Sequence, residues 1–399
     1  MRSPTHFRWL LLILAAVALS STPSVAQSPS AAPYAAIDRN AVDYKGPGRD
    51  AGHDLAGTEI RIGLLAPLTG PLQAEGDALR RAAQMAIDEI NGSSPLGLSG
   101  GNHLSLVIRD ESGPWGQVSK QVVEMVFDDR VLALITSSDG GTAHLAEQVG
   151  NKIGVSVLTL STDTTTTEIN LPWIFRMGTT DTAQAHAFAR DIYQTRKLKH
   201  VVLLSQDDRD GRIGGDEFTK AAREMSTPAP TRIVMESGKL PEEAGMKELE
   251  TAQAIVIWTD AAAANLLRAR LRNSLPTVPA YLCRKAVEGD PSNNGQLLCL
   301  TCASQDAGRW IASAAENPEA WREFRQRYQK LYGAEPGFGG AEAYDAVRIL
   351  AAALRRSGPN RARVRDALAG ISGFPGASGV ISFDRAGNDT SPVVLLKLR

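Results

Sequence analysis

The stretch IRIGLLAPLTGPLQAEGDALRRAAQMAIDEIN, residues 60–91, decides the fold. Residues 60–66 form an apolar run of strand length, and from Asp77 onward apolar residues return at helical spacing. The segment between them holds two prolines and two glycines, so a strand leads through a tight turn into a helix. In an open α/β sheet such a turn lies at the carboxyl end of a strand, where ligands tend to bind. The stretch therefore predicts one wall of a binding site.

The first 26 residues have the pattern of a cleavable secretory signal. Residues 1–8 carry two arginines and no acid, residues 9–19 are apolar, and Ser24, Val25 and Ala26 form a small-x-small exit. The apolar run falls short of the roughly 20 residues that a membrane span needs, so we expect a signal peptide cleaved after Ala26 rather than an uncleaved anchor. Residues 27–57, rich in Ala, Pro, Gly and Ser, predict a flexible N-terminal extension.

Composition narrows the classes of partner and chemistry. A formal net charge of −1 offers no basic surface for nucleic acid, so we expect no nucleic-acid partner. Cys283, Cys299 and Cys302 allow one disulfide and one free thiol in an oxidising compartment, with all three pairings open. The CxxC pair lies inside residues 297–303, which read as a strand, so we expect a structural rather than a redox role.

Predicted strands and helices alternate along the rest of the chain. Strands are expected at 103–109, 131–136, 155–159 and 173–177, with helices at 116–129 and 142–152. A second series has helices at 181–196, 214–225 and 261–273 and strands at 200–205, 231–236, 254–258 and 280–283. This alternation predicts two α/β lobes in tandem with mostly parallel sheets. Helices at 316–332, 340–356 and 361–368 are expected to cover the lobes, followed by short strands at 379–383 and 393–398.

No catalytic motif is present in the sequence. It lacks G-x-S-x-G, H-E-x-x-H, a P-loop and G-x-G-x-x-G. The histidines of the mature chain are scattered without the spacing of metal ligands. We therefore expect no enzyme, no metal site and no cofactor.

Two polar loops carry the signal for binding. Residues 137–142, SSDGGT, follow a strand and open a helix, so free backbone N–H groups and the positive end of the helix dipole can receive an anionic or polar group. The alternative is a well-capped helix that binds nothing. Ser161, Thr162 and Asp163 follow the next strand in the same way, with a purely structural polar loop as the alternative.

Several segments resemble, in order and spacing, the periplasmic solute-binding proteins that serve branched-chain amino acid ABC transporters. They are residues 63–72 (GLLAPLTGPL), 75–77 (EGD), 86–91 (AIDEIN), 172–176 (PWIFR) with Asp181, 324–333, 343–346 (AYDA) and 383–388. The resemblance covers about residues 59–399 and implies the type I periplasmic binding fold, in which three hinge strands join two Rossmann-like lobes. It places the crossings near Gly178, Ala303 and Gly379. The first lobe is then 58–178 plus 304–378, and the second is 179–303 plus 379–399.

The resemblance also implies a function. We expect a monomeric periplasmic receptor that closes around a small polar ligand, an amino acid or related compound, and delivers it to an ABC transporter membrane permease. The alternative is a sensor of the same fold that reports ligand occupancy to a signalling partner.

Binding positions carry over from the family residue by residue. The loop that holds the ligand carboxylate in the family matches Asp139, Gly140, Gly141 and Thr142, and the next binding loop matches Ser161, Thr162 and Asp163. Where relatives place aromatic residues around the ligand, this chain has Glu75, Asp210 and a residue near Asp260. Where amino-acid binders place the carboxylate that pairs with the ligand ammonium, this chain has Lys285.

The lysine at position 285 argues against an ordinary aliphatic amino acid. Its charge would repel a ligand ammonium, by several kcal/mol if both were desolvated. Asp163, Asp210 or Asp260 is expected to take over the ammonium, leaving Lys285 or Arg284 to pair with a second carboxylate. The sequence therefore predicts a polar ligand that carries more than one charge.

Overall fold

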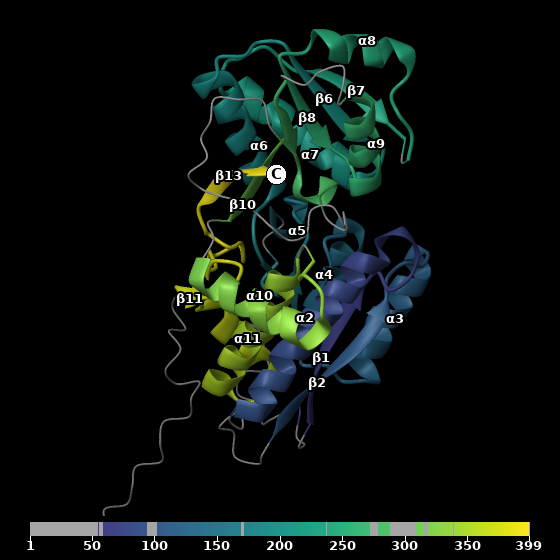
Figure 1. The fold of residues 1–399 in the computed structure, drawn as a ribbon. Helices are drawn as coiled ribbons and strands as arrows, with labels where there is room; N and C mark the ends of the chain where they lie inside the picture. The colour runs from purple at the N-terminus through teal and green to yellow at the C-terminus, as the bar shows by residue number, and fades with distance from the viewer. Residues whose placement is uncertain are drawn as a thin grey trace, which may run out of the picture.

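The computed structural model describes residues 55, 59–93, 102–168, 171–236, 238–271, 278–287, 309–314, 318–337 and 339–398. They form two α/β lobes, at opposite ends of the molecule in Figure 1. The predicted signal peptide, the predicted extension apart from Leu55 and the predicted crossing near Ala303 lie outside the described residues. So do Cys299 and Cys302, whereas Cys283 is a buried free thiol.

The first lobe is built on a parallel sheet with the strand order β2-β1-β3-β4-β5. Its strands are β1 (Glu59–Ala66), β2 (His103–Asp110), β3 (Ala133–Thr136), β4 (Ser156–Thr159) and β5 (Ile174–Arg176). Along β1, Ile60, Ile62 and Leu64 enter one core and Leu65 enters another, as the alternation of a strand requires. Burial on both faces explains why β1 reads as a nearly continuous apolar run.

Helices cover both faces of this sheet. The larger core contains residues of α2 (Gln73–Ser93), α10 (Pro318–Tyr332), α11 (Gly340–Ser357) and α12 (Arg361–Ala369). The smaller core contains residues of α3 (Trp115–Phe127) and α4 (Gly140–Ile153). Helix α11 packs along α2 although the two helices lie far apart in the sequence (Figure 1). The predicted covering role of the late helices is therefore confirmed.

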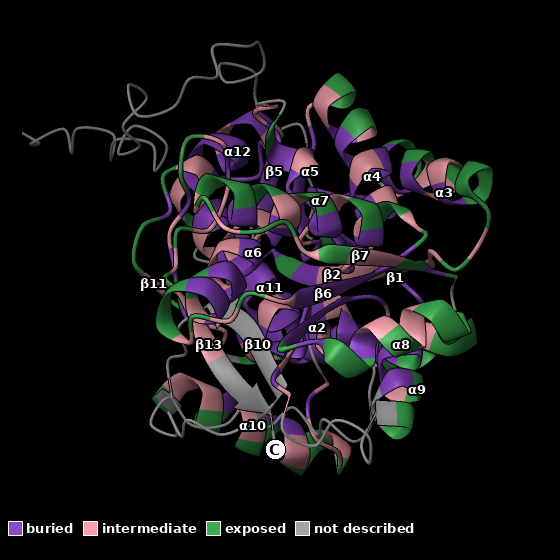
Figure 2. Ribbon diagram, turned by 90° about the horizontal axis from the view of Figure 1, so that it is seen from above, coloured by how far each residue is buried: buried purple, intermediate pink, exposed green. Residues whose placement is uncertain are grey.

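The second lobe is built on a sheet with the order β13-β10-β9-β8-β6-β7. Its strands are β6 (Val201–Gln206), β7 (Thr231–Met235), β8 (Ala254–Trp258), β9 (Ala280–Leu282), β10 (Arg309–Ala314) and β13 (Val393–Leu398). All neighbours are parallel except β13, which runs antiparallel to β10. The helices are α6 (Asp181–Ala189), continued by the π-helical η4 (Arg190–Thr195), α7 (Arg209–Glu224), α8 (Glu243–Thr251) and α9 (Ala261–Leu271). In Figure 2 the central strand β6 is purple and buried, whereas the edge strand β7 and helices α7, α8 and α9 show green, exposed residues. This architecture confirms the predicted fold class.

Two features of the second lobe differ from the sequence prediction. Helix α7 begins at Arg209 rather than near Gly214, because Asp208 caps it by accepting a hydrogen bond from the Gly211 N–H (2.7 Å). Its glycines serve close packing rather than a turn, since a Cβ on Gly211 would lie 2.3 Å from the Gln206 carbonyl oxygen. Helix α8 was not predicted; it is short, and its only residue recorded as buried is Leu249.

The C-terminal segment contacts both lobes. Phe383 packs on Phe175 of β5, with ring centroids 5.2 Å apart, and the Gly387 carbonyl accepts from the Arg176 N–H (2.8 Å). The predicted strand at 379–383 is the two-residue β12 (Val380–Ile381), which pairs with β11 (Phe374–Pro375) in a separate small sheet. Strand β10 pairs with β9 and β13 in the second lobe. We therefore propose crossings at Gly178, between Ala314 and Pro318, and between residues 389 and 393.

The turn after β1 is held by a close approach of backbone to backbone. Short helix η3 (Gly70–Leu72) precedes α2, and a Cβ added to Gly76 would stand 2.0 Å from the Pro67 carbonyl oxygen. Helix α2 therefore begins at Gln73, earlier than the predicted Asp77, and glycine at position 76 lets its first turn fold back on the loop.

We expect Gly76→Ala to lower the free energy of unfolding by about 2 kcal/mol, since the backbone must move to admit the methyl group. Gly92→Ala in the same helix is the matched control. Nothing lies within 4 Å of its added Cβ, so stability should stay the same or rise by up to about 1 kcal/mol. Urea unfolding of both variants measures the difference. Equal effects of the two substitutions would contradict the packing argument.

Candidate ligand site between the lobes

The two predicted binding loops lie at the carboxyl ends of β3 and β4. Asp139 is the N-cap of α4, and its Oδ1 accepts from the Thr142 N–H (2.6 Å). Gly140 and Gly141 occupy the first turn, whose N–H groups have no carbonyl partner within the helix. The helix thus begins two residues before the predicted Thr142, because aspartate is a strong cap.

The side chain of Arg176 holds the second binding loop in place through hydrogen bonds. Its fully buried guanidinium donates to the Ser161 carbonyl, to the Asp163 carbonyl (2.8 Å), and to the hydroxyls of Thr166 (2.6 Å) and Thr167 (3.1 Å). Burial lowers the pKa of Arg176 to about 10, so the group stays charged at neutral pH. These bonds fix the backbone of residues 161–167 and leave the Asp163 carboxylate facing the second lobe.

Asp163 is joined to the second lobe by Arg209, in the first turn of α7. The Arg209 Nε donates to Asp163 Oδ2 (2.7 Å), and its Nη2 donates to the Thr165 hydroxyl (2.8 Å) and lies 2.8 Å from His144 Nε2. Burial acts to raise the pKa of Asp163, but hydrogen bonds from His144, Thr165 and Arg209 outweigh it and hold the pKa below its ordinary value. Hydrogen bonds to Asp163 and Glu147 raise the pKa of His144 to about 9.

Asp210, one residue further along α7, meets the first lobe over Gly140. Its Oδ1 would stand 2.5 Å, and Asp163 Oδ2 2.8 Å, from a Cβ added to Gly140. The Lys285 ammonium donates to Asp210 Oδ2 (2.5 Å), whereas Asp210 Oδ1 is buried without a hydrogen-bond partner. Burial raises the pKa of Asp210 to about 6 despite the attraction of Lys285. Within this structure Lys285 is paired with a protein carboxylate of its own lobe.

Arg284 also has a protein partner. It is buried, and its Nη2 lies 2.8 Å from Glu342 Oε1 on α11, so this ion pair bridges the two lobes. Asp260 caps α9 through the Ala263 N–H (2.8 Å). It is linked to Asp208, the cap of α7, through Gln206, which accepts from the Asp260 N–H (3.0 Å) and donates to Asp208 (2.9 Å).

Two further carboxylates lie on the first-lobe side. Glu75, in the first turn of α2, is buried and accepts from the Ser138 hydroxyl (2.8 Å). Glu111, which directly follows β2, accepts from the Ser137 hydroxyl, and its Oε2 is buried without a partner. Burial and the nearby Asp139 raise the pKa of Glu111 well above its ordinary value. Glu111 was not predicted from the sequence, although its place directly after a parallel strand is a signal that points to a binding position.

Asp181 stands at the start of α6, three residues beyond Gly178. The residue is 1% exposed; its Oδ1 accepts from Gln184 (3.2 Å) and its Oδ2 has no partner. Burial raises the pKa of Asp181 to about 7, and Asp210 and Asp163 add to the effect. From the sequence, Asp181 was named only within the family resemblance, and neither Arg209 nor His144 was predicted to bind the ligand. These three residues are found only once the lobes are brought together.

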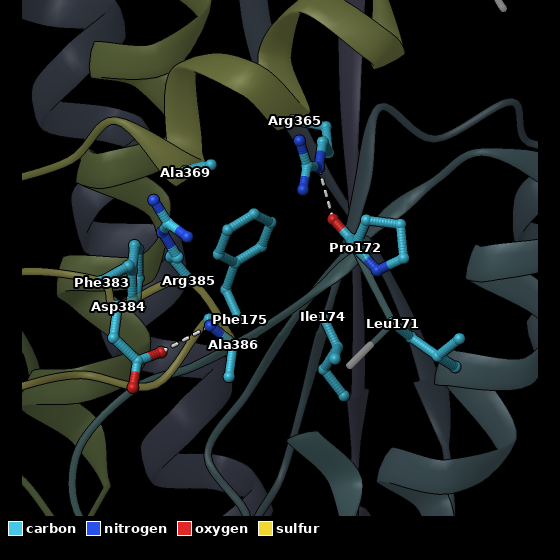
Figure 3. A pocket seen from close by; sticks show the side chains of 11 residues that line it. Leu171, Pro172, Ile174, Phe175, Arg365, Ala369, Phe383, Asp384, Arg385 and Ala386 are labelled. Carbon is cyan, nitrogen blue, oxygen red and sulfur yellow. Dashed lines mark hydrogen bonds between the residues drawn. The ribbon is translucent and has the colours of Figure 1, made fainter. Parts of the chain in front are cut away.

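A separate pocket of about 180 Å³ lies at the outer edge of the first sheet. Figure 3 shows Leu171, Pro172 and Ile174 on one side and residues 383–386 on the other, with Arg365 donating to the Pro172 carbonyl (2.5 Å). None of the predicted site residues lines this pocket.

Two findings concern metal binding and membrane spanning in the described part of the chain. Its His, Cys, Asp and Glu side chains form no group of three or more that could hold a metal ion. Across the same residues, no helix combines the length and apolarity that a membrane span requires.

Comparison with known proteins agrees with this architecture. Residues 59–273 and 303–395 match the family model described as periplasmic binding protein. Leu/Ile/Val-binding protein homolog 3 of Brucella melitensis is 25% identical over 343 residues, which are 84% of this chain and 89% of that protein. Leu/Ile/Val-binding protein BraC3 of Rhizobium johnstonii is 30% identical over 165 residues, so that match spans only 41% of this chain and 44% of that protein.

A solved structure shows the same fold. The branched-chain amino acid transporter substrate-binding protein LivJ of Streptococcus pneumoniae, in complex with isoleucine, superimposes with a TM-score of 0.70. The superposition covers 84% of this chain and 95% of LivJ at 22% sequence identity. At that identity the likeness shows the two-lobed fold and leaves the ligand open.

Proposed function

The chain belongs to the periplasmic binding protein family, and on that premise we propose that it is an exported receptor that captures a small polar ligand between its lobes. It delivers this ligand to an ABC transporter membrane permease. The relatives named above are solute-binding proteins rather than enzymes. The observation that carries the proposal is the meeting of Asp163 and Asp210, from opposite lobes, over Gly140.

The proposed site combines predicted residues with residues that the structure adds. The predicted ones are Glu75, Asp139, Gly140, Gly141, Thr142, Ser161, Thr162, Asp163, Asp210, Asp260 and Lys285. The added ones are Glu111, His144, Asp181 and Arg209. Residues 1–26 would direct export to the periplasm, where the mature protein acts as a monomer.

The mechanism follows from the position of these groups on two bodies. A ligand that touches both lobes binds the closed form more tightly than the open form, so it shifts the population toward closure. The permease then recognises the closed shape. Carboxyl oxygens of Glu111, Asp181 and Asp210 that stay buried without partners favour a ligand that supplies those partners.

Ligand-dependent compaction tests the proposed function. Mass spectrometry of compounds that co-purify with the protein supplies the ligand, and small-angle scattering compares the protein with and without it. We expect the radius of gyration to fall when the ligand is added. In Gly140→Ala the added Cβ would collide with Asp163 and Asp210, so compaction should be smaller, whereas Gly92→Ala should behave as the parent. A tight ligand that leaves the radius of gyration unchanged would exclude this mechanism.

A further inference from the structure

We propose that the ligand of the interlobe site is a linear organic dication, a compound with an ammonium or guanidinium group at each end of an alkyl chain. This inference rests on the proposed function and names the ligand class of the same site. Its basis is a set of buried carboxyl oxygens without partners at two positions, one where α6 and α7 begin and the other where β2 ends.

The first position lies at the hinge. Asp181 is 1% exposed and its Oδ2 has no hydrogen-bond partner. Oδ1 of Asp210 is also buried without a partner, although the Asp210 side chain as a whole is 13% exposed. The protein cations nearby are engaged elsewhere: Lys285 donates to the other oxygen of Asp210, and Arg209 donates to Asp163. Arg176 attracts Asp181 from β5, but its guanidinium donates hydrogen bonds to neutral carbonyl, amide and hydroxyl oxygens. An ammonium group has the three donors that these unpartnered oxygens lack.

The second position lies on the first-lobe wall. Glu111 Oε2 is buried without a partner, and the charges of Asp139 and Glu75 act on Glu111. Asp139 links the two positions, because its N–H donates to the Ser137 hydroxyl (3.1 Å), which donates to Glu111, and the next residue, Gly140, lies against Asp210. The carboxylates thus form two groups on either side of the α4 cap, one for each end of an elongated dication.

The unpartnered groups favour a ligand rich in hydrogen-bond donors. Asp181 Oδ2, Asp210 Oδ1 and Glu111 Oε2 are acceptors when ionised, so an ammonium or guanidinium group suits them better than a ligand carboxylate does. A single metal ion does not fit the described residues. Removing carboxylate oxygens from water without a partner is costly, and a bound cation offsets that cost.

Isothermal titration calorimetry with the full mature chain tests the ligand class. The probes are 1,4-diaminobutane, 1,5-diaminopentane and agmatine, with butylamine, leucine and succinate for comparison. We expect a dication to bind at least tenfold more tightly than butylamine, and leucine and succinate to bind more weakly still. Leucine as the tightest probe, or a dication no tighter than butylamine, would overturn the proposal.

The pH dependence provides a second readout. Asp181 faces Asp163, Asp210 and Arg176, and Asp210 faces Lys285, Asp139 and Asp208. A cation binds the ionised carboxylates, whose pKa values are about 7 and about 6, so affinity for a dication should rise from pH 5.5 to pH 8 and binding should release protons. An affinity that is flat over this range would contradict the assignment of these two groups.

Variants that keep the size of the side chain test which carboxyl groups hold the two ends of the dication. Asp181→Asn and Glu111→Gln keep the size of each side chain, and each should weaken dication binding at least tenfold. Asp207→Asn removes an exposed carboxylate of the loop before α7 and should leave binding unchanged. Parental affinity in both buried variants would overturn the proposal. A co-purified anion or zwitterion that compacts the protein would refute the ligand class alone, whereas a protein that no small ligand compacts would refute the proposed function.

Discussion

Replacing Arg176 by methionine should lower the free energy of unfolding by about 4 kcal/mol, because the substitution removes the guanidinium N–H groups that donate hydrogen bonds to a buried loop. The guanidinium serves the carbonyls of Ser161 and Asp163 and two threonine hydroxyls, and its Nε donates to Asn388 (3.1 Å). Methionine fills much of the volume but leaves these oxygens buried without partners.

Urea unfolding of the full mature chain measures this loss. Arg212→Met is the control, since Arg212 is more than half exposed and pairs with the equally exposed Asp207 (3.2 Å). Its effect should stay below about 1 kcal/mol. Arg176→Lys keeps the charge but not the planar fork, so it should remain clearly destabilising. If Arg176→Met unfolds at the same urea concentration as Arg212→Met, the loop does not depend on the buried arginine.

Asp181→Asn should stabilise the protein above pH 7, by about 4 kcal/mol, while leaving stability near pH 4 unchanged. The ordinary pKa of the group is 3.8, and burial raises it to about 7 in the folded protein. Between these values the folded state binds a proton that the unfolded state does not. The contribution of Asp181 to stability is therefore present below about pH 4 and is lost as pH rises to about 7.

The comparison needs unfolding curves of parent and variant at pH 4, 6 and 8. The stability difference should grow with pH and level off near pH 8, and Asp207→Asn should show no such trend because Asp207 is exposed. A difference that is the same at every pH would show that Asp181 is not held protonated by burial. A stabilising substitution that weakens binding would also explain why the chain carries a costly buried acid at its hinge.

The fold was largely predictable from the sequence, because apolar periodicity survives wherever a segment is buried. Ile60, Ile62 and Leu64 alternate as a strand must, and α11 shows its buried face at helical spacing. The start of α7 was not predictable in this way. The predicted helix began at Gly214, so Gly211 fell in the preceding turn. Only the neighbouring Gln206 backbone and Trp258 ring show that Gly211 and Gly214 allow the helix to lie close to a strand.

The sequence predicted those parts of the candidate site that depend on local order along the chain. Asp139 and Asp163 follow strands of one lobe, so local order was enough to place them. Asp181, Glu111 and Arg209 belong to the site only through contacts between distant segments. The sequence predicted that Lys285 would be available for a ligand carboxylate, yet the lysine is paired with Asp210 in the structure.

The path of the C-terminal segment bears on the order in which the molecule is assembled. Asn388 bonds both Arg176 and Thr167, and it lies more than 200 residues from either along the chain. Residues 383–388 complete the β5 edge of a sheet whose five strands all lie before residue 177. The first lobe therefore depends on the docking of a segment from the far end of its own sequence. Because such long-range contacts form slowly, we expect the β5 edge to be among the slower parts of this lobe to fold.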